Sequence, residues 1–149
     1  MQKITPFLWF DGNVAEAVQF YTGIFKNSKT VSLSPGPGGT TMAATLSLEG
    51  QELILFNGGP MFKFTEAFSL SVNCETQEEI DNFWVQLSAG GKTSQCGWLK
   101  DKFGLSWQIV PSNLGALLNN PDPQKANKVM KAMLQMTKLI IADLKNAGA

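Results

Sequence analysis

The spacing of apolar residues over residues 1–60 predicts a strand, a helix and three further strands. A short apolar run at 7–10 indicates a strand, and Asn13 with Glu16 is typical of a capped helix start. The helical stripe that follows consists of Val14, Ala17, Val18, Tyr21, Ile24 and Phe25. Three strand patterns come next, at residues 29–34, 42–48 and 51–57. The first module therefore has the order βαβββ.

The same order recurs further along the chain. Phe83-Trp84 repeats Phe20-Tyr21 at an offset of 63 residues, since 83 − 20 = 63, and Thr76 with Glu79 repeats the capped start. The flanking strand patterns lie at residues 67–73, 91–96, 97–104 and 105–110. A duplicated unit is thus predicted, with a second βαβββ module over residues 65–112.

Residues 121–147 have the pattern of one amphipathic helix. Asp122 or Pro123 begins it. Its broad apolar face consists of Val129, Met130, Met133, Leu134, Met136, Ile140, Ile141 and Leu144. We expect this face to cover either the sheet or a partner subunit. The whole chain, residues 1–149, is predicted to form a single α+β domain.

Composition excludes several functions. All twelve basic residues are lysines, the formal net charge is zero, and the chain contains neither arginine nor histidine. We therefore expect no nucleic-acid binding, no histidine-dependent catalysis and no imidazole metal site. No glycine cluster follows a strand as G-x-G-x-x-G, which speaks against a dinucleotide or S-adenosylmethionine loop. No cofactor is expected.

The sequence also indicates a cytoplasmic protein. It shows no signal-peptide pattern and no apolar run near the roughly 18 residues of a membrane span. Its two cysteines, Cys74 and Cys96, fit a reducing compartment. Cys74 is expected to be a buried, inert thiol, because no histidine or arginine is present to lower its pKa.

Gln108 is the strongest site candidate, because it is a neutral amide in the middle of an otherwise apolar strand. It is either a ligand-orienting group or a structural amide bonded to a neighbouring strand. Alternation places small polar side chains on the sheet face opposite the helices, with Leu8 and Phe10 on the same side. That face is either a small-molecule pocket or solvent-exposed sheet. The predicted ligand-binding residues are Gln108, Ser69, Ser71, Phe10 and Trp98. Asp101 is expected to cap a turn.

Three stretches resemble the PhnB-like branch of the vicinal oxygen chelate superfamily, which includes glyoxalase I and the bleomycin resistance proteins. They are "ITPFLWFDGNVAEAVQFYTGIF", "DKFGLSWQIVP" and "NPDPQKANKVMKAMLQMTKLIIADL", and the last is the most specific part of the resemblance. Members of this branch often carry the name 3-demethylubiquinone-9 3-methyltransferase. The resemblance implies curved, open mixed sheets around a cavity, and a homodimer.

The resemblance also bears on metal binding. In metal-dependent relatives, a glutamate four residues after the turn glycine binds the metal, and its counterpart here is Gln108. The other ligand positions fall near Pro6, Ile54 and Ala67, whose side chains cannot bind a metal. The resemblance therefore implies a cavity without a metal.

Three classes of function follow. The first is a metal-independent small-molecule-binding protein, of the kind that bleomycin resistance proteins exemplify. The second is an enzyme, either a methyltransferase as the inherited name suggests or a metal-free lyase or isomerase. The third is a structural or regulatory dimer.

Overall fold

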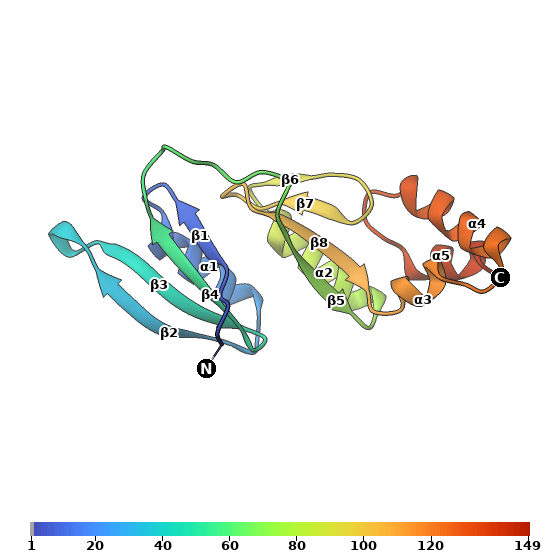
Figure 1. Ribbon diagram of the computed structural model, residues 1–149, viewed down its shortest axis with the longest axis horizontal. Helices are drawn as coiled ribbons and strands as arrows, with labels where there is room; N and C mark the ends of the chain where they lie inside the picture. The colour runs from blue at the N-terminus through green and yellow to red at the C-terminus, as the bar shows by residue number, and fades with distance from the viewer. Residues whose placement is uncertain (1) are drawn as a thin grey trace. The chain divides into compact units, whose positions relative to one another are not determined.

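The computed structural model describes residues 2–149, which divide into two compact units, one ending at Phe64 and the other spanning Thr65–Ala149. The first unit has the order β1 (Phe7–Phe10), α1 (Val14–Ile24), β2 (Ser28–Pro35), a 3₁₀ turn η1 (Pro37–Gly39), β3 (Thr41–Leu48) and β4 (Gln51–Asn57). Its sheet has the strand order β1-β4-β3-β2 (Figure 1). Only the β1–β4 pair is parallel. The predicted βαβββ module is confirmed.

The second unit repeats this arrangement. It contains β5 (Ser69–Cys74), α2 (Gln77–Ser88), β6 (Lys92–Thr93), β7 (Trp98–Lys100) and β8 (Ser106–Pro111). The strand order β5-β8-β7-β6, with β5 parallel to β8, matches that of the first sheet. The fold is therefore α+β with two related modules, as the 63-residue offset predicts.

The two helix starts differ in how their first N–H groups are satisfied. Thr76 caps α2, because its hydroxyl accepts from the Glu79 N–H at 3.1 Å. Asn13 makes no capping bond at α1. Instead the Asn57 side chain, at the end of β4, accepts from the Val14 N–H at 3.2 Å. The first capping prediction is therefore wrong, since a residue distant in sequence performs that role.

The two faces of β1 are exchanged relative to the prediction. Leu8 and Phe10 are buried, whereas Phe7 is 59 % exposed. The parallel partner of Leu8 is Leu55, which is fully buried, so Leu8 and Phe10 lie on the core side of the sheet. All four residues of β1 are apolar, so the sequence pattern does not show which face of the strand is buried.

An aromatic cluster consequently occupies the open face of the first sheet. The Trp9 ring lies edge-on to the rings of Phe56 and Phe62, with centroid distances of 5.4 and 5.1 Å. The Trp9 indole N–H donates to the Gly59 carbonyl at 2.9 Å. A side chain at Gly58 would overlap the Trp9 ring, so this position requires glycine. The open face of the first sheet is therefore aromatic, whereas the sequence predicts a small, polar face.

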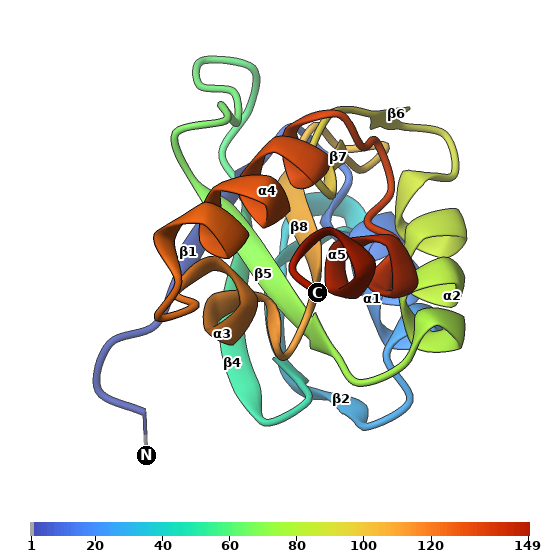
Figure 2. The ribbon, with the colours of Figure 1, turned by 90° about the vertical axis from the view of Figure 1, so that its right-hand side faces the viewer.

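The C-terminal segment is helical but does not form one helix. It contains α3 (Leu114–Leu118), α4 (Pro123–Leu134) and α5 (Ile141–Ala147), which gather beyond the end of β8 (Figure 2). Their apolar side chains form a core with Val110 of β8, and its fully buried members are Val129, Leu139 and Leu144. The buried part of this face therefore packs among the three helices and against Val110, at the end of the sheet, instead of covering a sheet face, and contact with a partner subunit stays a prediction.

The prediction of a continuous helix over 121–147 is wrong because the chain between α4 and α5 forms tertiary hydrogen bonds. The backbone N–H groups of Cys96 and Gly97 donate to the carbonyls of Met136 and Thr137, both at 2.8 Å. The Gln77 side chain also spans the break. Its amide donates to the Leu139 carbonyl at 3.1 Å, and its oxygen accepts from the Ile141 N–H at 2.8 Å. These tertiary hydrogen bonds satisfy backbone groups that a continuous helix would otherwise pair within itself, so the helix is interrupted although the apolar spacing continues.

Candidate functional site

The open face of the second sheet carries most of the predicted site. Gln108 on β8 lies opposite Ser71 of β5 on one side and opposite Trp98 of β7 on the other. Two residues earlier on β8, Ser106 lies opposite Ser69 of β5 on one side and opposite Lys100 of β7 on the other. The Gln108 amide donates to the Ser69 hydroxyl at 3.0 Å. Four of the five predicted residues are thus brought together on one sheet face.

Phe10 is the exception. It belongs to the first unit, is only 2 % exposed, and its ring packs edge-on against Phe64 at 5.3 Å between centroids. Because Phe10 lies on the core side of its sheet, the structure gives it a packing role. The prediction that Phe10 lies on the polar face is wrong, because it assigns the two faces of β1 the wrong way round.

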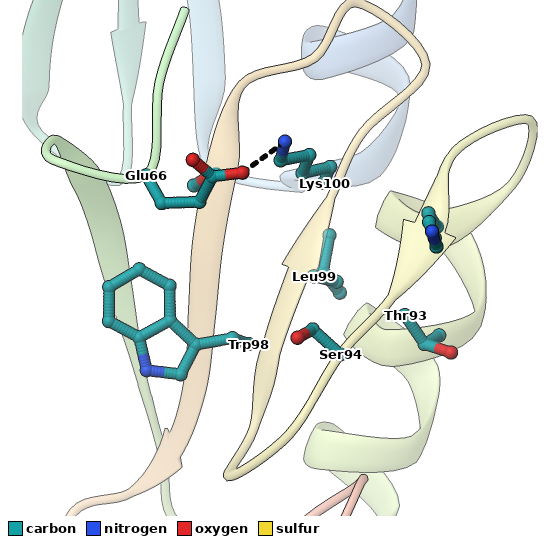
Figure 3. A pocket seen from close by; sticks show the side chains of 8 residues that line it. Glu66, Thr93, Ser94, Trp98, Leu99 and Lys100 are labelled. Carbon is teal, nitrogen blue, oxygen red and sulfur yellow. Dashed lines mark ion pairs between the residues drawn. The ribbon is translucent and has the colours of Figure 1, made fainter.

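A pocket opens beside this polar face, with a volume of about 210 Å³. Its lining consists of Glu66, Lys92, Thr93, Ser94, Trp98, Leu99, Lys100 and Ser106 (Figure 3). Trp98 is the only predicted residue among them. Gln108, Ser69 and Ser71 adjoin the pocket through the sheet without lining it.

Two charged groups meet at the pocket. The Lys100 ammonium forms an ion pair with the Glu66 carboxylate, and Figure 3 shows this pair beyond one end of the Trp98 indole. The hydrogen bond from Lys100 is the main cause that lowers the pKa of Glu66 below its ordinary value. Glu66 is therefore a carboxylate at neutral pH, and both side chains remain substantially open to solvent.

The Ser106 hydroxyl has an unusual position. Ser106 is only 1 % exposed, and its oxygen has no hydrogen-bond partner within residues 2–149. A buried polar group left unpaired costs about 1–3 kcal/mol of stability. Ser106 lines the pocket, so a ligand with a suitable atom would satisfy it. This orphaned hydroxyl is the clearest sign of a binding function.

Ser106 and Lys100 are not among the predicted site residues, although the sequence contains a signal for both. Ser106 is two residues before Gln108, so strand alternation puts the two on the same face. Lys100 is related to Trp98 in the same way. Glu66 comes from the loop before β5, and only the folded chain brings it to Lys100.

Asp101 has the turn-capping role that the sequence predicts. It is 2 % exposed, and its carboxylate accepts from the backbone N–H groups of Phe103 and Leu105 at 2.9 and 3.1 Å. It also accepts from the indole N–H of Trp107 at 2.9 Å. Asp101 therefore holds the β7–β8 turn against the start of β8.

Cys74 is the inert thiol that was expected. Its side chain is fully buried at the end of β5. Burial, followed by the negative charges of Glu79 and Glu75, raises the pKa of Cys74 to about 12. The nucleophilic thiolate is therefore scarce at neutral pH.

The donor set does not suit a metal ion. Residues 2–149 contain no cluster of three or more histidine, cysteine, aspartate or glutamate side chains arranged to hold one. Pro6, Ile54 and Ala67, at the positions implied by the resemblance, have no side-chain donor atom. A divalent cation requires several oxygen, nitrogen or sulfur ligands, which these positions cannot provide.

The duplicated βαβββ architecture and its open-faced sheets define the glyoxalase and bleomycin resistance type of fold. The chain belongs to the 3-demethylubiquinone-9 3-methyltransferase family, whose model matches residues 2–110. No curated protein matches the chain. The helices α3, α4 and α5 lie beyond the family match, so the comparison lends no support to the C-terminal stretch as the most specific part of the resemblance.

Solved structures agree with this assignment. A PhnB protein from Bacillus cereus is 40 % identical, with a TM-score of 0.69, and the alignment covers 74 % of this chain and 99 % of that one. Protein PA1353 from Pseudomonas aeruginosa is 21 % identical over 74 % and 98 % of the two chains, with a TM-score of 0.61. A fosfomycin resistance protein from Listeria monocytogenes, solved with Mn(II) and sulfate, is 15 % identical over 73 % and 92 %, with a TM-score of 0.56. The latter two similarities show the fold alone.

Proposed function

We propose that this protein binds a small organic molecule in the pocket on the open face of the second sheet. The observation that carries the proposal is the buried Ser106 hydroxyl, which lines the pocket without a hydrogen-bond partner in the described chain. Trp98 supplies an apolar wall, and Lys100 with Glu66 supplies charge. Small-molecule sites combine apolar side chains with polar groups that orient the ligand, and this pocket contains both.

Binding is proposed to be metal-independent, because the donor set of this chain differs from that of a metal site. The test is elemental analysis of protein purified without a metal-affinity tag. We expect less than a stoichiometric amount of any transition metal. One equivalent of zinc, nickel, manganese or iron per chain would contradict the proposal.

Methyl transfer is the second candidate, favoured by the name of the family. It requires a site for a methyl donor such as S-adenosylmethionine. No strand of this chain is followed by a G-x-G-x-x-G loop, and the pocket is smaller than the 300–1,000 Å³ typical of sites for larger ligands. The binding function therefore has the stronger support.

Thermal-shift screening tests binding and methyl transfer together. A ligand that binds only the folded protein raises its unfolding temperature. We expect small aromatic compounds to stabilise the protein and S-adenosylmethionine to have no effect. Stabilisation by S-adenosylmethionine would favour the methyltransferase, and no response to any compound would favour a structural or regulatory protein.

A matched pair of variants ties the response to the pocket. Trp98→Ser removes the apolar wall and should abolish the ligand-induced shift. Val85→Ser changes an exposed apolar residue of α2 outside the pocket and should leave the shift unchanged. Equal responses of the two variants would place the ligand elsewhere.

We also propose a cytoplasmic homodimer. The dimer follows from the family resemblance, and light scattering should give twice the chain mass of 16.2 kDa. Cys74 and Cys96 are both free thiols, which suits a reducing compartment. No helix within residues 2–149 is long and apolar enough to cross a membrane.

A further inference from the structure

Two lysines of the pocket oppose each other across neighbouring strands. Lys92 on β6 is the direct cross-strand partner of Lys100 on β7, and both line the pocket. Like charges placed directly opposite each other destabilise a sheet. Glu66 neutralises Lys100, whereas Lys92 makes no ion pair with any residue of 2–149. The lining therefore keeps an excess positive charge that the fold itself does not compensate.

Ser106 adds a hydrogen-bond donor beside these lysines. It is the cross-strand partner of Lys100, on β8, and it lies on the same face of the sheet. Its unpaired hydroxyl can donate a hydrogen bond to an acceptor atom. An anionic oxygen would satisfy the hydroxyl and the excess positive charge together, which neither a neutral nor a cationic ligand can do.

The volume of the pocket limits the size of the ligand. An engineered apolar cavity of about 150 Å³ holds one benzene molecule. The pocket here is about 210 Å³, which leaves room for one ring and a small substituent. Trp98 offers an aromatic surface against which a flat ring can pack.

The ligand class of this pocket rests on the proposed binding function. The geometry points to a compact carboxylate with a single flat ring, held by Lys100 and Ser106 and packed against Trp98. Lys92 adds long-range attraction for the anion at the same end of the pocket. The proposed contacts bind the ligand without changing its covalent bonds.

Glu66 is then a displaceable counter-ion. The Glu66–Lys100 pair is solvent-exposed, with side-chain exposures of 63 % and 41 %, and exposed ion pairs contribute little to stability. An incoming carboxylate can take the place of Glu66 on Lys100 without a large penalty. Glu66 thereby competes with an anionic ligand for Lys100 and lowers the affinity for that ligand.

The experiment compares three probes of nearly equal size that differ in charge: benzoate, benzamide and benzylamine. Binding to the full-length protein is measured by ligand-observed NMR titration at pH 7 and low salt. We expect benzoate to bind about tenfold more tightly than benzamide, since a hydrogen bond to a charged group contributes more than a neutral one. Benzylamine should bind most weakly.

Four variants locate the anion. Lys100→Gln should weaken benzoate binding about tenfold and leave benzamide unchanged. Ser106→Ala should weaken benzoate binding about fivefold without loss of folding stability, because it removes an unpaired buried group. Glu66→Gln should strengthen benzoate binding about threefold by releasing Lys100. Lys125→Gln, outside the pocket, is the control for net charge and should change nothing.

The outcomes separate this inference from the proposed function. Equal affinities for benzoate and benzamide, or a benzoate affinity unaffected by Lys100→Gln, would overturn the carboxylate ligand while leaving small-molecule binding intact. If no benzoate binds but neutral aromatic compounds still stabilise the protein, the ligand class alone is wrong. A complete lack of binding by every compound would overturn both.

Discussion

Gln108 now has a defined partner, which favours its structural role. Its amide donates to Ser69, joining β8 to β5 across the open face, and it does not line the pocket. Gln108→Ala should lower the free energy of unfolding by about 1 kcal/mol, the usual net value of one hydrogen bond. Urea denaturation measures this loss, and benzoate titration should show a smaller effect than that of Ser106→Ala. A larger loss of affinity than of stability would restore Gln108 as a direct ligand contact.

Gln108→Glu extends the test, because it introduces the carboxylate of metal-dependent relatives. We expect this variant to bind no metal, since Pro6, Ile54 and Ala67 offer no further side-chain ligands. Elemental analysis after incubation with Mn²⁺ and Zn²⁺ and exhaustive dialysis measures the outcome. A stoichiometric metal in Gln108→Glu but not in the parent protein would show that other donors complete the site.

Cys74 predicts a pH dependence of stability. Burial raises its pKa to about 12 in the folded protein, from an ordinary value near 9. Between these values the unfolded chain releases the thiol proton while the folded chain retains it, so stability falls as pH rises. The loss should approach about 1.4 kcal/mol per pH unit above pH 9. Urea denaturation from pH 8 to 10.5 should show a steeper decline for the parent protein than for Cys74→Ala, and parallel curves would contradict the assignment.

At the scale of elements, the chain between α4 and α5 shows where periodicity fails. The apolar spacing continues through residues 135–140, yet backbone bonds to Cys96 and Gly97 and the burial of Leu139 interrupt the helix. Gly97 has a φ of 83°, and a side chain there would meet the Ile109 carbonyl at 2.8 Å and the Leu139 side chain, which belongs to this segment, at 3.0 Å. Only glycine lets the turn approach this segment so closely. Such tertiary contacts have no signature in a single-sequence pattern.

Gln77 is the side chain that fastens this break. Gln77→Ala removes both the donor to the Leu139 carbonyl and the acceptor for the Ile141 N–H. We expect a loss of about 2 kcal/mol in the free energy of unfolding. Gln86→Ala, on the same helix, removes only an exposed bond to Asn82 and should cost less than about 0.5 kcal/mol. Equal losses in urea denaturation would show that the break is held by packing alone.

At the scale of the whole molecule, duplication made the fold predictable, whereas the site depended on contacts between segments. The repeat at an offset of 63 residues predicted both sheets because cap, stripe and strand recur together. Alternation also placed Ser69 and Ser71 on the face opposite the helices, where Gln108 lies. The pocket itself needs Glu66 from a loop and Lys92 from a two-residue strand, and neither has a periodic pattern. The alternation of residues along a strand thus predicts which side chains share a sheet face, but it does not predict the pocket beside that face.

The C-terminal helices should stabilise the second unit without contributing to the pocket. Residues beyond Ser112 bury Val110 and accept the Cys96 and Gly97 hydrogen bonds, yet none of them lines the pocket. A chain ending at Asn113 should therefore lose about 5 kcal/mol in the free energy of unfolding, because it loses the Cys96 and Gly97 hydrogen bonds and the two that Gln77 makes, and it exposes Val110.

Single variants provide a milder form of the same test. Leu139→Ala, at a fully buried position, should lose about 3 kcal/mol, whereas Leu134→Ser, at a position 53 % exposed, should lose little. The benzoate affinity of the shortened chain, of Leu139→Ala and of Leu134→Ser, corrected for the folded fraction, should equal that of the full chain. Because stability and binding are measured separately, a weaker affinity at full folding would show that the C-terminal helices shape the pocket. Unchanged stability of the shortened chain would show instead that these helices are not part of the core of the second unit.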